Sequence, residues 1–183
     1  ISESEREKQK NRKFLTPVTF SIITPLYNTP ENYLKELLES LQKQTYPNWQ
    51  LCLADGSDNE HGYVGEICRE YAAKDPRICY EVLEENKGIS ENTNECLKFA
   101  TGDYIGLLDH DDILHESALY EMMKVIEEEK ADFLYSDEVK FSGRIEDASD
   151  FNFKPGFGKD ELRAHNYICH FTVFKKSLLD QIG

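Results

Sequence analysis

Short apolar runs alternate along this chain with longer stretches in which apolar residues recur every three or four positions. Residues 18–24 are rich in β-branched side chains, a pattern typical of a strand. Thr29 is expected to cap the following helix, with Pro30 at its first position. The leucines that come next repeat with the spacing of one helical face, and they are Leu34, Leu37, Leu38 and Leu41. This stretch therefore predicts an amphipathic helix packed on a core.

The same alternation of strand and helix recurs further along the chain. The predicted strands are residues 49–54, 78–83, 104–108 and 132–136, and the predicted helices are residues 62–73, 90–100 and 117–129. Such alternation is typical of a parallel sheet covered by helices on both faces. The pattern predicts an α/β fold with a doubly wound, mainly parallel sheet. In such sheets, ligands bind at the edge where the strands have their carboxyl ends.

The last third of the chain is patterned less regularly. Residues 139–141 predict the start of a hairpin, and residues 147–158 an irregular segment. Aromatic residues in such a segment favour a small satellite core, and here they are Phe151, Phe153 and Phe157. A last strand is predicted at residues 166–175. It contains His170, and a histidine in a strand is more often a structural residue than a ligand.

Residues 1–17 differ from the rest in being mostly polar and highly charged, and the chain does not begin with methionine. We expect this segment to be a helical tail or a linker from an upstream segment. One domain at residues 18–183 would follow, since that length is enough to bury a core. We also expect the chain to be part of a longer protein.

The charge of the chain limits its classes of partner. The net charge is −14 and the sequence pI is about 4.8, whereas nucleic-acid binding calls for a basic surface. No apolar run approaches the roughly 20 residues of a membrane span. We therefore expect no nucleic-acid partner and no transmembrane segment. The expected location is the cytoplasm, at the inner face of the membrane if other parts of the full-length protein bring the chain there.

The five cysteines show neither CxxC pairs nor the spacing of a zinc site. Cys52 and Cys79 fall in predicted strands, and Cys68 and Cys96 in predicted helices. Cysteines in such places are typical of reduced, buried thiols in a cytosolic protein. They are assigned no chemistry.

The mostly apolar run at residues 104–108 leads directly into Asp109, Asp111 and Asp112. Such a run favours a strand buried on both faces, and carboxylates crowded at its end repel one another. A divalent cation would relieve the repulsion, because Mg²⁺ and Mn²⁺ prefer oxygen ligands. The alternative is an acidic helix start, above all for Asp112, since aspartate is favoured at helix N-termini.

Several other ligand-binding motifs are missing from the sequence. Residues 86–90 lack the glycine-rich run of a P-loop, and no GxGxxG follows the first predicted strand. Neither a GxSxG elbow nor an HExxH motif is present. What remains is an α/β sheet with a carboxylate–metal site, where the metal would hold an anionic diphosphate in place of a glycine loop.

A series of ordered motifs resembles the family 2 glycosyltransferases of the GT-A fold, particularly bacterial enzymes that build surface polysaccharides and rhamnose-type glycans. The resemblance runs from about residue 18 to the end of the chain. Its motifs are residues 20–28 (FSIITPLYN), 44–46 (QTY), 54–57 (ADGS), 86–90 (NKGIS) with Asn94, 100–104 (ATGDY), 108–112 (LDHDD), 153–155 (FKP) and 166–170 (NYICH). It implies a GT-A, Rossmann-like fold.

The resemblance also implies roles for individual residues. The nucleotide-binding residues would be Pro25, Tyr27, Asp55, Lys87 and Asp109. Of these, Tyr27 would offer its ring to the base and Asp55 would hydrogen-bond the base. Ala54 departs from the family, which has a first carboxylate there, but Asp55 keeps the position that reads the base.

For the diphosphate and the sugar, the resemblance implies a second set of residues. Asp109 and Asp111 would hold the Mn²⁺ or Mg²⁺ that bridges the diphosphate. Asp137, Glu138 and His170 are candidates for the donor-sugar pocket. Val139 departs from the acidic residue that is common after Asp-Glu in this branch.

The implied reaction is the inverting transfer of a sugar from a nucleotide diphosphate to a hydroxyl group. The donor would be a UDP-sugar or dTDP-rhamnose, and the acceptor a glycan or lipid-linked glycan. In this family the general base belongs to a Glu-Asp- or Gln-Asp-type motif, which we expect beyond Gly183. We therefore expect this chain to bind a nucleotide sugar but to transfer it slowly or not at all.

Two alternatives remain open. A sugar-1-phosphate nucleotidyltransferase uses a related fold and a metal, but its first loop is rich in glycine and contains arginine, unlike residues 25–28. A non-catalytic nucleotide-sugar-binding or interaction module would keep the fold without the reaction.

Overall fold

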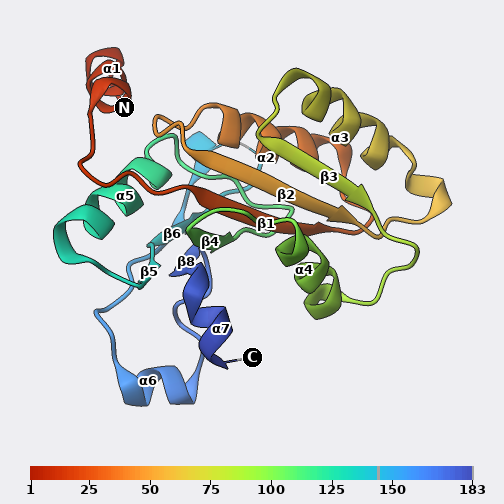
Figure 1. Ribbon diagram of the computed structural model, residues 1–183. Coiled ribbons are helices and arrows are strands. Elements are labelled where there is room, and N and C mark those ends of the chain that lie inside the picture. Colours follow the sequence, from red (N-terminus) through yellow and green to blue (C-terminus); the bar gives the residue numbers. More distant parts are fainter. Residues whose placement is uncertain (144, 183) are drawn as a thin grey trace.

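A six-stranded sheet forms the centre of the computed structural model, which describes residues 1–143 and 145–182 (Figure 1). The strand order is β3-β2-β1-β4-β8-β5, where the strands are β1 (Phe20–Leu26), β2 (Trp49–Asp55), β3 (Ile78–Val82), β4 (Tyr104–Leu107), β5 (Phe133–Tyr135) and β8 (Thr172–Lys175). The first four are parallel neighbours, and β8 is antiparallel to both β4 and β5. The predicted α/β fold with a mainly parallel sheet is confirmed.

Helices cover both faces of this sheet (Figure 1). On one face lie α2 (Glu31–Gln42), α3 (Tyr63–Lys74) and α5 (Ala118–Glu129); on the other lie α4 (Ile89–Lys98) and, packing through Leu179, α7 (Leu179–Ile182). Successive strand residues point to opposite faces, so Ile22 joins the core under α2 while Ile23 joins the core under α4. The sheet is therefore buried from both sides, as the apolar strands predict.

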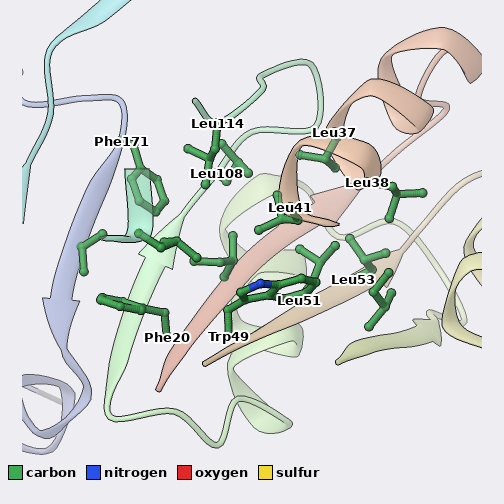
Figure 2. Close-up of a cluster of buried hydrophobic side chains, with 14 of the residues drawn as sticks. Phe20, Leu37, Leu38, Leu41, Trp49, Leu51, Leu53, Leu108, Leu114 and Phe171 are labelled. Carbon is green, nitrogen blue, oxygen red and sulfur yellow. The ribbon is translucent and has the colours of Figure 1, made fainter. Parts of the chain in front are cut away.

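The leucine stripe of α2 has the packing role that its spacing predicts. Figure 2 shows Leu38 and Leu41 facing Leu51 and Leu53 of β2, while Leu37 is directed toward Leu108 and Leu114. All three leucines are fully buried. Thr29 does not cap this helix, contrary to the prediction: the cap position is Pro30, without a side-chain hydrogen bond. The hydroxyl of Thr29 is engaged elsewhere, as described below.

The first strand extends beyond its predicted end and includes Pro25. Proline lacks an N–H group and is disfavoured inside a sheet. Here β4 pairs with β1 only from Phe20 to Ile23, while β2 continues to Leu26. Pro25 thus lies where β1 has a partner on one side alone, and the chain stays extended to the point where ligands bind in this fold class.

The predicted last strand at residues 166–175 is wrong in its first part, because β8 begins only at Thr172. The carbonyl oxygens of Ile168 and His170 accept hydrogen bonds from the Lys154 ammonium, and the Thr172 hydroxyl donates to the carbonyls of Ile168 and Cys169. Carbonyls occupied in this way are withdrawn from a strand ladder. Residues 166–171 consequently form a loop, and His170 lies before the strand.

The segment between β5 and β8 contains the predicted hairpin. Strand β6 (Glu138–Lys140) pairs antiparallel with β7 (Asp150–Asn152), and a short helix, α6 (Lys159–Ala164), follows. The expected satellite core is wrong, since the three phenylalanines of this segment are 59%, 77% and 72% exposed: Phe151, Phe153 and Phe157. Phe151 and Phe153 stack on each other at the surface instead.

The polar segment before β1 contains a helix, α1 (Glu3–Asn11), that is attached to the domain by polar contacts. The Arg6 guanidinium donates to Glu116, with 2.7 Å between Nε and Oε2. The Thr45 hydroxyl donates to the buried Gln9 amide oxygen over 2.8 Å. Among the helices of the described residues, none is long and apolar enough to cross a membrane.

All five cysteines lie in the described part of the chain and are free thiols. Cys52 and Cys79 lie in strands and Cys68 and Cys96 in helices, as predicted. Burial raises the pKa of Cys68 to about 12, which keeps that thiol protonated. The expectation of buried thiols is wrong for Cys169, which is exposed in the loop before β8.

Candidate functional site

A hollow of about 380 Å³ opens at the carboxyl ends of β1 and β4. Its walls include four of the residues expected to bind the nucleotide or the metal, namely Pro25, Tyr27, Asp109 and Asp111. The loop before α4 contributes Asn86 and Gly88 to the lining, and the first turn of α4 contributes Ile89. The Tyr27 side chain is accessible, with 47% of the residue exposed. The parallel sheet therefore brings residues 80 positions apart into one concave surface.

Asp55 lies at the end of β2 and is nearly buried, at 5% exposure. One carboxylate oxygen accepts from the Ser57 backbone N–H over 2.9 Å, and the other accepts from the Tyr80 hydroxyl over 2.7 Å. Burial and the contact with this carboxylate raise the pKa of Tyr80, so its hydroxyl stays a donor. Each carboxylate oxygen has further lone pairs, and Asp55 can accept another hydrogen bond.

Lys87 is set apart from these residues. It lines a neighbouring hollow with Glu81, Glu84 and Glu85, and its ammonium lies 3.8 Å from Glu85. Its backbone N–H donates over 3.2 Å to the side-chain oxygen of Asn92, a buried residue that borders both hollows. The Lys87 backbone therefore lies near the hollow that Tyr27 lines. Its side chain lies in the second hollow, whose lining is acidic.

The acidic residues after β4 form a turn in which the Asp112 N–H donates to the Asp109 carbonyl over 3.2 Å. The interpretation of Asp112 as a helix cap is wrong, because α5 begins only at Ala118 after Ser117. Burial raises the pKa of the Asp112 carboxyl, and the neighbouring Asp109 carboxylate adds to the effect. This turn concentrates negative charge at the rim of the hollow.

Asp112 forms with Asp109 and His170 a group whose potential ligand atoms all lie within 4.8 Å of one another. His170 Nδ1 is 3.5 Å from Asp112 Oδ2 and 3.8 Å from Asp109 Oδ2. Asp111, the predicted second metal ligand, lines the hollow and is outside this group. Two carboxylates and an imidazole are a donor set that fits a divalent transition ion. Asp112 belongs to the carboxylate cluster for which the sequence predicted a cation, but the ligands expected from the family resemblance were Asp109 and Asp111.

His110, in the same turn, connects the site to the core. Its Nδ1 lies 2.5 Å from the hydroxyl of Thr29, which is fully buried just before α2. This contact explains why Thr29 is not a helix cap, and it fixes the acidic turn against the end of β1. No pattern in the sequence predicts this pair, since the two residues are far apart along the chain.

The remaining predicted residues, Asp137 and Glu138, are held by Lys154. The Asp137 carboxylate accepts from the Lys154 backbone N–H over 2.8 Å, and Glu138 Oε2 lies 3.3 Å from the Lys154 ammonium. Burial tends to raise the pKa of Glu138, but the hydrogen bond from Asn152 and the charge of Lys154 outweigh it and lower that pKa. Lys154 was not among the predicted site residues, although residues 153–155 (FKP) are one of the motifs of the family resemblance.

Comparison with known proteins identifies one family over most of the chain. Residues 21–183 match the sequence profile described as "Glycosyl transferase family 2". The O-antigen biosynthesis protein RfbC of Myxococcus xanthus is 30% identical over 164 residues, which are 89% of this chain. The chain spans only 13% of that relative's length.

Solved structures of similar fold cover nearly the whole chain. The S. aureus TarS 1–349 structure in complex with UDP-GlcNAc matches 89% of this chain and 47% of its own, with a TM-score of 0.69 and 24% identity. The mannosyltransferase PcManGT from Pyrobaculum calidifontis, in complex with GDP-Man and Mn²⁺, matches 98% of this chain and 52% of its own. Its TM-score is 0.63 and its identity 16%.

Proposed function

The chain belongs to glycosyl transferase family 2, and we propose that it is the nucleotide-sugar-binding part of a metal-dependent, inverting enzyme of polysaccharide or cell-surface glycan synthesis. The observation that carries the proposal is that Asp109 belongs to two features at once. It lines the hollow beside Tyr27, and it is a member of the group with Asp112 and His170. A ligand with an aromatic base and a diphosphate would occupy both.

The nucleotide side is supported by the chemistry of the hollow. Its size is within the range of small-molecule sites. The exposed ring of Tyr27 offers a stacking surface for a base. Asp55, at the end of β2, is nearly buried and does not line the hollow, but it keeps lone pairs that could accept from a base N–H group at the floor of the site. The UDP-GlcNAc bound by the TarS structure is a ligand of this class. A UDP-sugar is the donor we propose, with dTDP-rhamnose as the second candidate.

The cation side is supported by the donor set. Asp109, Asp112 and His170 would hold the ion, and the imidazole favours Mn²⁺ over Mg²⁺, which prefers oxygen ligands alone. The bound ion would neutralise charge on the departing diphosphate. The Mn²⁺ in the PcManGT structure is consistent with this choice. Asp111, on the wall of the hollow, would then face the ribose or the phosphates of the nucleotide.

The sugar is expected to lie toward Asp137, Glu138 and His170. Both acidic side chains are engaged by Lys154, so we assign neither as the base that removes the acceptor proton. We propose that this base comes from residues beyond Gly183. The acceptor would be a glycan or lipid-linked glycan hydroxyl.

The test is calorimetric titration of the chain with UDP, dTDP and GDP, each with Mn²⁺ or with EDTA. We expect one nucleotide to bind with Mn²⁺ and its binding to be lost with EDTA. Tyr27→Ala should weaken binding because a base–aromatic stack typically contributes about 1–3 kcal/mol. Asp160→Asn is the matched surface control, since the Asp160 side chain is 97% exposed and outside the hollow. Nucleotide binding that is unchanged by EDTA and by Tyr27→Ala would overturn the proposal.

A further inference from the structure

Lys154, in the loop after β7, has a charged side chain that is almost completely buried. The side chain is 1% exposed, although lysine ammonium groups are normally solvated. The ammonium contacts Glu138 Oε2 at 3.3 Å, the Ile168 carbonyl oxygen at 3.3 Å and the His170 carbonyl oxygen. An ammonium has three N–H donors, and these three acceptors use all of them.

These contacts join two segments that belong to different sheets: β6 pairs with β7, whereas β8 pairs with β4 and β5. Glu138 begins β6, while Ile168 and His170 belong to the loop that precedes β8. The Lys154 backbone N–H adds a bond to Asp137. A buried charge is costly unless it is paired and hydrogen-bonded, so the ammonium holds its acceptors in a narrow range of positions.

The loop held in this way carries the imidazole of the candidate cation group. The backbone carbonyl of His170 is bonded to Lys154, and the side chain of the same residue approaches Asp112 and Asp109. We propose that Lys154 is a positioning residue, which fixes the His170 loop so that the imidazole completes the divalent-cation site. This inference rests on the proposed function, because the cation site is part of it.

Positioning and simple electrostatics predict opposite effects of removing the Lys154 charge. Lys154 contacts Glu138, and the His170 residue that it holds approaches Asp109 and Asp112, so its surroundings are acidic. Removing a positive charge there would by electrostatics alone strengthen cation binding. If Lys154 positions His170, its removal weakens cation binding, since residues that orient metal ligands typically contribute about 10–100-fold in affinity.

The experiment is a titration of the chain with Mn²⁺, with free Mn²⁺ followed by its electron paramagnetic resonance signal. Lys154→Met keeps the apolar stem and is expected to weaken Mn²⁺ binding at least about tenfold. In a His170→Ala background the same change should have little further effect, because both act through one ligand. Lys140→Met is the control: that side chain is on β6, is 74% exposed and pairs with Asp150 at the surface.

A second variant covers the case in which Lys154→Met leaves the half-buried Glu138 carboxylate without its cationic partner and unfolds the chain. Lys154→Met with Glu138→Gln removes both members of the pair and leaves the net charge unchanged. The same loss of Mn²⁺ affinity is expected in it. The inference would be overturned if the folded Lys154 variants bound Mn²⁺ as tightly as the native chain or more tightly. It would also be overturned if the losses of Mn²⁺ affinity caused by Lys154→Met and His170→Ala were fully additive.

Hydrogen–deuterium exchange in metal-free protein separates this inference from the proposed function. Peptides covering residues 166–171 should exchange about tenfold faster in Lys154→Met, and at the native rate in Lys140→Met. If the native chain binds no Mn²⁺, the proposed cation site fails. If the native chain binds Mn²⁺ but the exchange and affinity of Lys154→Met are native-like, the positioning role alone fails.

Discussion

The hollow beside Tyr27 and the group around His170 share Asp109, yet they are held in place by different kinds of interaction. The hollow is built on the ends of parallel strands, whose positions follow from ladders and from apolar packing on both faces of the sheet (Figure 1). The His170 group depends on a loop whose carbonyls are bonded to one buried ammonium. Many individually weak contacts therefore hold the hollow in place, whereas a few hydrogen bonds from one buried charge hold the His170 group.

The comparison implies different responses to mutation. A change in the core under α2 lowers the stability of the whole domain but does not selectively move the residues of the hollow, since the sheet unfolds as a unit. A change at Lys154 leaves the sheet intact and releases one loop. Stability and cation binding should therefore be separable by choosing the region that is mutated.

The largest effect on stability is expected for Leu37→Ala, in the core under α2. Leu37 is fully buried in this core, on the side of Leu108 and Leu114, and a leucine-to-alanine change in such a place typically costs about 2–5 kcal/mol (Figure 2). Urea denaturation should show this loss, while the Mn²⁺ and nucleotide affinities of the folded protein stay native. Leu15→Ala is the control, because Leu15 is 90% exposed and should change stability by less than about 0.5 kcal/mol. Loss of Mn²⁺ affinity in folded Leu37→Ala would remove the distinction between the two regions.

The next effect concerns the two aspartates that follow His110. Asp112→Asn should weaken Mn²⁺ binding at least about tenfold, since it removes a group within reach of both Asp109 and His170. Asp111→Asn is the matched comparison and should lower nucleotide affinity more than Mn²⁺ affinity measured without nucleotide, because Asp111 lines the hollow. Mn²⁺ titrations with and without UDP measure both. The reverse ranking would restore the sequence-based assignment of Asp109 and Asp111 as the metal ligands.

The region that depends on packing was also the region that the sequence could predict. The leucine spacing of α2, the apolar strands and their order of alternation all follow from burial, which is a local property of the pattern. Pro25 and Asp109 were expected at one edge because parallel strands end on the same side, and the family resemblance added Tyr27. The structure places them there.

The second region could not be predicted in the same way, because its geometry depends on pairs far apart in the sequence. The bonds from Lys154 to residues 168 and 170 withdraw carbonyls from a strand that the pattern of residues 166–175 favoured. The His110–Thr29 contact likewise removed an expected helix cap. Hydrogen bonds between distant side chains leave no periodic signal in the sequence.

The smallest effect is expected at the ion pair between Arg6 and Glu116, which joins α1 to the loop before α5 and is more accessible than that of Lys154. The hydrogen bond from Arg6 lowers the pKa of Glu116 to about 2. A carboxylate with a lowered pKa stabilises the fold above its ordinary pKa near 4.5, and that contribution disappears as the pH falls toward 2. The Arg6 side chain is 30% exposed and solvent screens the pair, so Glu116→Gln should cost about 1 kcal/mol or less at neutral pH.

Urea denaturation from pH 7 to pH 2 should show the native and Glu116→Gln stabilities converging at the acid end, with Mn²⁺ affinity at pH 7 unchanged. Glu70→Gln, at the exposed pair with Lys74, is the control and should show a smaller difference at pH 7. A loss of Mn²⁺ affinity in Glu116→Gln would mean that α1, and not only the Lys154 loop, holds the cation group in place.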